Sequence, residues 1–126
     1  MSAAAARDVP VLIHEYFAAW EARDPDRIAA LHSANTRFEL HGDAAGPAIG
    51  QAAARRAVAK ILDRFPGFAI EVQRLLLGSD HWVLDWTLVA HPDGREVRVP
   101  LLDVVTLDAD GLIATKDTYL ASGVTA

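Results

Sequence analysis

The apolar residues at the start of the chain recur at helical spacing. They are separated by steps of three, four, seven and eight residues, which predicts one buried face of a helix. The positions concerned are Val9, Leu12, Ile13, Tyr16, Phe17 and Trp20. Asp24 and Pro25 then have the character of a helix N-cap and a first helical residue, and they predict a second, short helix. A third helix is predicted over residues 51–65.

From residue 68 onward the period of the pattern changes to two, which is typical of strands. Turn-forming residues divide this half of the chain into strands over residues 68–77, 81–91, 95–107 and 112–120, and they predict an antiparallel meander. A short strand is predicted over residues 36–40, and residues 42–50 are expected to form a loop. Because the later strands are long, the sheet must twist and curl.

Helices in the first half and strands in the second predict an α+β fold. We expect a curved, mainly antiparallel sheet wrapped by three N-terminal helices around a cone-shaped cavity. The 126 residues suit a single domain with its core over residues 9–120. The net charge of −5 argues against a nucleic acid or an anionic membrane as partner, and the absence of cysteine excludes thiol chemistry. Without an apolar run of about 20 residues or a secretory signal, a cytoplasmic location is expected.

The predicted strand over residues 95–107 carries a single acid among aliphatic residues. Alternate residues of a strand share one face, and here they are Val97, Val99, Leu101, Asp103, Val105 and Leu107. An isolated carboxylate on an apolar inner surface is costly, and protonation is the usual escape. Asp103 is therefore predicted to donate a hydrogen bond, as a neutral acid, to a ligand oxygen. The alternative is a structural role, in which it bonds a buried polar group of the protein.

Aromatic residues suggest where such a ligand would lie. Tyr16 carries the one hydroxyl on the apolar face of the first helix, and it either converges with Asp103 on one ligand atom or is a core aromatic whose hydroxyl reaches the surface. Trp82, Leu84, Trp86 and Leu88 share one face of the next strand, where they form the floor of a pocket or simply the core.

Several segments resemble the SnoaL-like group of the nuclear-transport-factor-two-like, or ketosteroid-isomerase-like, superfamily. They are Tyr16-Phe17-Ala18-Ala19-Trp20 with Asp24, Leu102-Asp103-Val104-Val105, and Asp110-Gly111-Leu112-Ile113 before Tyr119. The resemblance extends over about residues 9–120. It implies the cystatin-like, or nuclear-transport-factor-two-like, α+β barrel. It leaves the reaction open, because the superfamily includes isomerases, polyketide cyclases, dehydratases, epoxide hydrolases and non-catalytic binding domains.

The resemblance also implies catalytic roles. In ketosteroid isomerases an acidic residue takes a proton next to a carbonyl, while a tyrosine and a protonated aspartic acid hold the resulting oxyanion. Tyr16 and Asp103 match this oxyanion pair. The position of the base is Leu40, which cannot accept a proton. His41 is then the candidate proton acceptor, provided that a bulge at Gly42 turns its side chain inward.

Lys116 leaves two readings open. The family register places Lys116 and Thr118 on the pocket side of the last strand, where the lysine either reaches the rim with its ammonium group or pairs with Asp103. Such a pair would keep the acid ionised and end its role as a donor. The other residues expected to contact a ligand are Trp20, Phe38, Leu40, Leu84, Trp86, Leu88 and Leu101. Arg55, Arg56 and Arg64 are expected on the solvent face of the third helix.

Taken together, the sequence predicts a SnoaL-like enzyme that transfers a proton in an apolar carbonyl-bearing or polycyclic substrate, as an isomerase or cyclase does. The alternative is a non-catalytic domain of the same fold that binds a small ligand. No cofactor is implied, and the five histidines lack metal-ligand spacing, so no metal site is expected. A homodimer is expected through apolar residues of the outer sheet face, which are Val83, Val89, Leu102 and Val104.

Overall fold

The computed structural model of the protein describes residues 8–120. Its helices are α1 (Val9–Glu21), α2 (Pro25–Ala30) and α3 (Gln51–Arg64). Its strands are β1 (His32–Leu40), β2 (Ala48–Ile49), β3 (Ala69–Leu77), β4 (His81–Ala90), β5 (Val97–Leu107) and β6 (Ile113–Leu120). A short 3₁₀ turn, η2 (Pro92–Gly94), connects β4 to β5. None of the described helices combines the length and apolar character that crossing a membrane requires.

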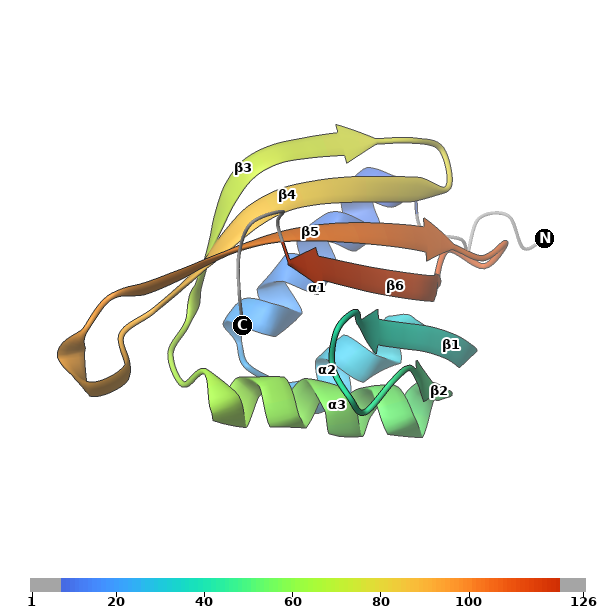
Figure 1. The fold of residues 1–126 in the computed structure, drawn as a ribbon. Helices are drawn as coiled ribbons and strands as arrows, with labels where there is room; N and C mark the ends of the chain where they lie inside the picture. The colour runs from blue at the N-terminus through green and yellow to red at the C-terminus, as the bar shows by residue number, and fades with distance from the viewer. Residues whose placement is uncertain (1–7, 121–126) are drawn as a thin grey trace.

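The strands form one curled, unclosed sheet in the order β2-β1-β6-β5-β4-β3 (Figure 1). Each of the strands β3, β4 and β5 pairs antiparallel with the strand that follows it in the chain, as the turn residues between them predict. Strand β1 runs parallel to β6 and antiparallel to β2. The predicted fold class, a curved and mainly antiparallel sheet with three N-terminal helices, is therefore confirmed.

The helices begin where the sequence places side chains that cap them. Asp8 accepts the backbone N–H of Val11 at 3.0 Å at the start of α1, and Asp24 accepts the N–H groups of Asp26 and Arg27 at the start of α2. Helix α1 lies across one face of the sheet, and α3 runs along its lower side in the view of Figure 1. The face of the sheet under α1 is the inner face, and the opposite one is the outer face.

Two details of the first half differ from the prediction. Strand β1 begins at His32 rather than at Thr36, and the predicted loop contains the two-residue strand β2. The segment His32-Ser33-Ala34-Asn35 has no alternation that would indicate a strand, and its placement depends on pairing with the distant β6. Local patterns do not encode a partner so far away in the chain.

The register of the sheet determines which residues face inward. Asp103 of β5 lies between Leu84 of β4 and Thr118 of β6, while Val105 lies beside Lys116. Leu102 belongs to the outer face and is 37% exposed. The homodimer expected on that face stays a prediction.

Candidate functional site

A cavity of about 610 Å³ opens between α1, the C-terminal end of α3 and the inner face of the sheet. This volume is within the range of pockets that bind drug-sized molecules. Every residue that the sequence predicts as catalytic or ligand-binding borders this cavity. The set comprises Tyr16, Trp20, Phe38, Leu40, His41, Leu84, Trp86, Leu88, Leu101, Asp103, Lys116 and Thr118. Most of its wall is aromatic and aliphatic, and its buried polar groups gather where β5 and β6 lie under α1.

Asp103 is buried at 4% exposure, but it is not alone. The hydroxyl of Thr118 donates a hydrogen bond of 2.8 Å to its Oδ1 atom, and the ammonium nitrogen of Lys116 lies 3.8 Å from Oδ2. The prediction of an isolated acid is therefore wrong, because the sequence pattern of β5 could not show the lysine on β6.

Lys116 does not reach the rim of the cavity, as one reading of the sequence expected. It is only 7% exposed, and its ammonium group lies 4.8 to 5.5 Å from the ring centroids of Trp20, Tyr16 and Phe38. Burial by itself lowers the pKa of Lys116, but the neighbouring Tyr16 and Asp103 outweigh it and raise the pKa above its usual value. The cavity therefore contains a buried cation that is held by a carboxylate and by aromatic faces.

Tyr16 connects this pair to a second buried polar group, His32. The ammonium group of Lys116 donates to the tyrosine oxygen at 3.3 Å, and that oxygen is 3.0 Å from Nε2 of His32. On the far side of the ring, Nδ1 of His32 is 3.0 Å from the hydroxyl of Thr36, which itself donates to the carbonyl of Ala114 at 3.3 Å. A continuous chain of hydrogen bonds thus runs from the cavity into the core.

The direction of each hydrogen bond in this chain can be assigned from its ends. Because the Thr36 hydroxyl donates to a carbonyl, it must accept from Nδ1–H of His32, and Nε2 is then the acceptor for the Tyr16 hydroxyl. Burial, aided by the charge of Lys116, lowers the pKa of His32 to about 3, so its imidazole is neutral at pH 7 as this assignment requires. The hydroxyl hydrogen of Tyr16 is thus committed to His32. Within this hydrogen-bonded chain, the donor that remains for a ligand oxygen is the ammonium group of Lys116. The indole N–H groups of Trp20, Trp82 and Trp86, whose side chains also line the cavity, have no hydrogen-bond partner among residues 8–120.

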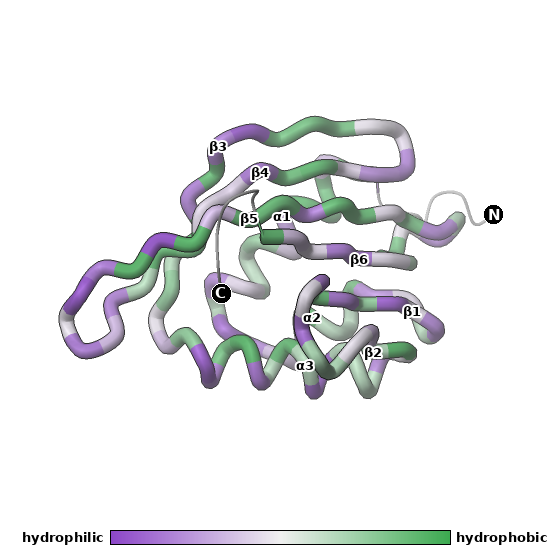
Figure 2. Tube along the Cα trace, in the orientation of Figure 1, coloured by the Kyte–Doolittle hydropathy of each residue, from purple (hydrophilic) through white to green (hydrophobic). Residues whose placement is uncertain are grey.

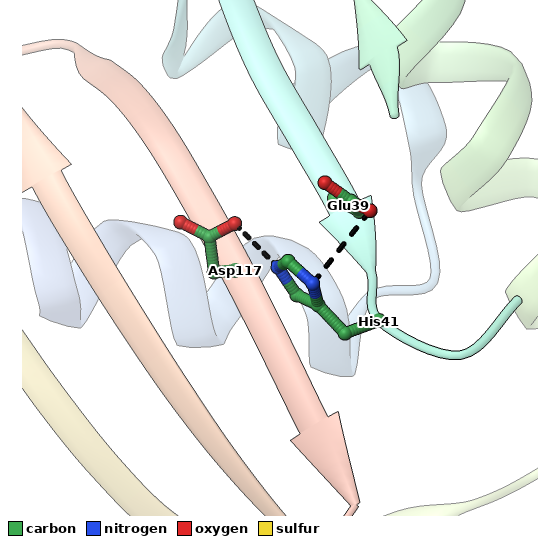
Figure 3. Close-up of side chains that lie close together, drawn as sticks. All are labelled: Glu39, His41 and Asp117. Carbon is green, nitrogen blue, oxygen red and sulfur yellow. Dashed lines mark hydrogen bonds and ion pairs between the residues drawn. The ribbon is translucent and has the colours of Figure 1, made fainter. Parts of the chain in front are cut away.

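His41 borders the cavity, but its ring is turned to the outer face of the sheet. Its backbone N–H donates to the carbonyl of Thr118 at 2.9 Å, so the strand ladder continues through His41 without the bulge that the prediction required. Its Nε2 atom lies 2.7 Å from Asp117, and its ring stacks on Tyr119 with 4.2 Å between centroids. Figure 3 shows it between Glu39 and Asp117. The role of His41 as proton acceptor in the cavity has no support in this geometry.

Glu39, His41 and Asp117 offer ligand atoms that all lie within 4.8 Å of one another, which is a spacing suited to a metal ion. Sequence spacing could not indicate this group, because β1 and β6 bring it together across the sheet. Arg37 already forms ion pairs with both carboxylates, at 2.9 Å to Asp117 and with Glu39. A guanidinium group thus provides the positive charge that a metal ion would bring, and we interpret this outer cluster as an ion-pair network.

Two features of the site were missed by sequence reasoning. His32 is fully buried, yet it stands at the start of a strand whose first residues carry no recognisable pattern. Arg56 and Arg64 are exposed, as expected for the solvent face of α3, and together with Lys60 they also border a second hollow that the sequence did not indicate. A period of four along α3 was the available indication for the latter group, since it places all three on one side of the helix.

Comparison with known protein families gives one match, in which the SnoaL-like domain family covers residues 13–116. A comparison with curated protein sequences finds no match. Among solved structures, the chain is similar to a candidate SnoaL-like polyketide cyclase from Jannaschia sp. CCS1, with 20% identity and a TM-score of 0.75. The alignment covers 89% of this chain and 83% of that protein.

Two further structures show the same fold. SalBIII, an epoxide hydrolase/cyclase-like enzyme in pyran ring formation in the polyether salinomycin, is 21% identical with a TM-score of 0.75, and 90% of each chain is covered. A candidate isomerase of the SnoaL-like family from Agrobacterium tumefaciens is 24% identical with a TM-score of 0.70, covering 90% of this chain and 97% of that one. At these identities the likeness shows the fold alone.

Proposed function

Because this chain belongs to the SnoaL-like family, we propose that it is an enzyme that moves a proton next to a carbonyl group in a small, largely apolar substrate. The observation that supports this most is the pair of opposite charges inside the cavity, where Lys116 and Asp103 lie 3.8 Å apart among aromatic and aliphatic side chains. A cation and a carboxylate side by side are the two groups that enolisation requires. One stabilises the oxygen, and the other accepts the proton.

The steps follow from the assigned hydrogen bonds. The substrate carbonyl accepts a hydrogen bond from the ammonium group of Lys116, which replaces its long contact with Asp103. The Asp103 carboxylate then takes a proton from the carbon next to the carbonyl, and the electron pair moves onto the oxygen as an enolate. In a substrate with a double bond β,γ to the carbonyl, return of the proton from Asp103 to the γ-carbon gives the conjugated isomer. In a substrate with a second carbonyl group, attack of the enolate carbon on that carbonyl carbon breaks its C=O π bond, and Asp103 returns the proton to the resulting alkoxide oxygen, which gives ring closure.

Neighbouring residues hold the two reacting groups in place. Thr118 fixes one oxygen of Asp103, and Tyr16 fixes the ammonium group while its own hydrogen is bonded to neutral His32. The apolar wall excludes water, which strengthens the attraction between the ammonium group and a developing enolate. In this scheme Tyr16 is a positioning residue. It does not itself donate to the oxyanion.

The test uses β-tetralone, a bicyclic ketone with acidic protons, in D₂O. Exchange of its α-protons followed by NMR detects enolisation without knowledge of the natural product. The wild-type chain should accelerate exchange, and Asp103→Asn and Lys116→Met should each lower the accelerated rate by about 10²–10³-fold. Rates equal to wild type in the Asp103→Asn variant would refute the assignment. A loss in His41→Gln as large as in Asp103→Asn would return the proton-acceptor role to His41.

A specific observation favours a second candidate, a non-catalytic ligand-binding domain. Leu40 lines the cavity at the position where the family resemblance implies a catalytic acid. This candidate predicts that β-tetralone or a similar ketone binds, with a shift of the melting temperature, while its α-protons exchange no faster than in buffer. Lys116→Met would then weaken binding and leave the exchange rate at the level of buffer.

A further inference from the structure

A second hollow of about 370 Å³ adjoins the cavity between α3 and the loop that follows β1. The two share an apolar wall that includes Phe38, Ile61 and Phe65. We call this second hollow the α3 groove. Its opposite side carries three cations, Arg56, Lys60 and Arg64, and Arg64 also borders the cavity itself.

The three cations are arranged in a row. They are spaced four residues apart on α3, so they stand one above the other along one side of the helix, over a length of roughly 12 Å. Like charges at this spacing repel each other and weaken a helix. In the sequence an apolar residue follows each cation of the row, and Figure 2 shows hydrophilic and hydrophobic stretches alternating along the α3 tube.

No carboxylate within residues 8–120 forms an ion pair with this row. None of the three side chains takes part in an ion pair with a described residue, and the guanidinium of Arg64 rests 5.4 Å from the ring centroid of Phe65. Asp43 is the one acidic residue of the described chain that borders the groove, and its carboxylate accepts the backbone N–H of Ala45 at 3.0 Å. The neighbouring Arg55, by contrast, points to the other side and pairs with Asp26 at 2.5 Å.

The charge of this groove is opposite to that of the whole chain. The sequence carries a net charge of −5, whereas three basic residues and one acidic residue, Asp43, border this concave surface, so its charge is locally reversed. A concave surface of one charge attracts small ions of the opposite charge, and arginine matches carboxylate and phosphate groups with two parallel hydrogen bonds. The groove is therefore built to receive an anion, and its shared wall connects it to the apolar cavity.

We propose that the α3 groove is an anion subsite, and that the ligand of this protein carries its carbonyl on an apolar body in the cavity and a carboxylate or phosphate on a flexible tail in the groove. The inference rests on the proposed function to the extent that the carbonyl body occupies the cavity. It adds the chemical class of the substrate, which is an amphiphilic anion, and it assigns Arg56, Lys60 and Arg64 as residues that determine specificity.

The probes are ω-(2-naphthoyl)alkanoic acids of increasing chain length, their methyl esters, and the corresponding alkyl phosphates. Binding is followed by quenching of the tryptophans that line the cavity. For wild type we expect the acid to bind about tenfold more tightly than its ester once the chain is long enough to reach the row. The triple variant Arg56→Gln/Lys60→Gln/Arg64→Gln should bind acid and ester equally, at the affinity of the ester. Arg55→Gln is the matched control and should retain the preference.

The outcomes separate this proposal from the proposed function. Equal binding of acid and ester by wild type, or an equal loss of both in the triple variant, would overturn the subsite, as would no binding of any probe at millimolar concentration. If proton exchange in β-tetralone fails but the preference for the acid persists, the subsite stands and only the proton-transfer role falls. The alkyl phosphates show which anion is preferred, because the preferred anion binds more tightly than the methyl ester by the larger factor.

A readout without ligand tests the repulsion directly. In dilute buffer the triple variant should melt about 1–2 °C higher than wild type, and the difference should disappear in 1 M salt. A triple variant that melts lower than wild type in dilute buffer would show that the cations have partners, and it would contradict the proposal.

Discussion

The two faces of the sheet at β1 and β6 each carry a cation paired with one or two carboxylates, in different surroundings. The register sets Phe38 beside Lys116 and Glu39 beside Asp117, so alternate residues of the same strands go to opposite faces. On the inner face a cation, Lys116, lies beside the carboxylate of Asp103. On the outer face a cation, Arg37, lies between the carboxylates of Glu39 and Asp117. Each group also includes a histidine.

The difference between the faces is the access of water. The Lys116 side chain is 8% exposed, and that of Arg37 is 40% exposed. An ion pair in water changes the free energy of folding little, because both charges stay solvated. A buried charge without a partner destabilises the folded state strongly, because it has lost its solvation. The same chemistry is therefore a weak surface network on one face. On the other face it is a buried pair that is held under an apolar wall.

The largest expected effect comes from breaking the inner pair. Lys116→Met should lower the free energy of unfolding by about 3–5 kcal/mol, because it leaves the carboxylate of Asp103 buried without its cation. The measurement is urea denaturation at pH 7, followed by tryptophan fluorescence.

The control for this prediction removes both charges. The double variant Asp103→Asn/Lys116→Met keeps an acceptor for Thr118 and leaves no bare charge, so it should recover most of the lost stability. If Lys116→Met alone costs less than about 1 kcal/mol, the inner pair behaves like a surface pair. The contrast between the faces would then be unfounded.

The pH dependence of stability tests the surroundings of the buried histidine, His32. Burial and the charge of Lys116 lower the pKa of His32 to about 3, from 6.5 in an ordinary setting. Below pH 6.5 the unfolded chain therefore binds a proton at His32, whereas the folded chain binds this proton only near pH 3 and below. Stability must fall as the pH decreases through this window, and by this residue alone the slope is about 1.4 kcal/mol per pH unit.

The matched variant is His32→Gln, whose amide can still bond Tyr16 and Thr36 but cannot take up a proton. Between about pH 6 and pH 4, the free energy of unfolding of wild type should decrease faster than that of the variant by this slope. Denaturation curves at each pH give both values, and the difference cancels the other titrating groups. Parallel curves would mean that His32 is protonated in the folded state, and the hydrogen-bond directions assigned to Tyr16 would be reversed.

The inner group was partly predictable, because its residues belong to regular patterns. The period of two along β5 places Asp103 inward, and the helical spacing of α1 does the same for Tyr16, so both residues could be located without a structure. The cavity wall follows from the same alternation. These patterns could not predict the partner of each group. Lys116 contacts Asp103 from the neighbouring strand, and His32 contacts Tyr16 from a segment whose sequence does not alternate.

The outer cluster of Arg37, Glu39, His41 and Asp117 could not be located from the sequence, although its residue types could be read from it. His41 was assigned to the cavity on the assumption of a bulge, and the positive φ of 93° at Gly42 shows that the chain does turn there. The turn comes one residue too late, since the ladder to β6 still includes His41. Pairing between β1 and β6 is parallel and distant in sequence, and such contacts are decided by the packing of the whole sheet.

The smallest expected effect is on the outer face, and salt is the means to isolate it. Arg37→Gln removes the cation that joins Glu39 to Asp117, and it should cost no more than about 1 kcal/mol in dilute buffer because the guanidinium is partly in water. In 1 M salt the difference from wild type should vanish, since the screening length falls to about 3 Å. The cost of Lys116→Met, measured in the same salt, should stay nearly unchanged because ions do not enter the buried pair. If the loss of stability in Arg37→Gln persisted in 1 M salt, the outer cluster would behave like a buried ion pair. Exposure to water would then not explain the difference between the two faces.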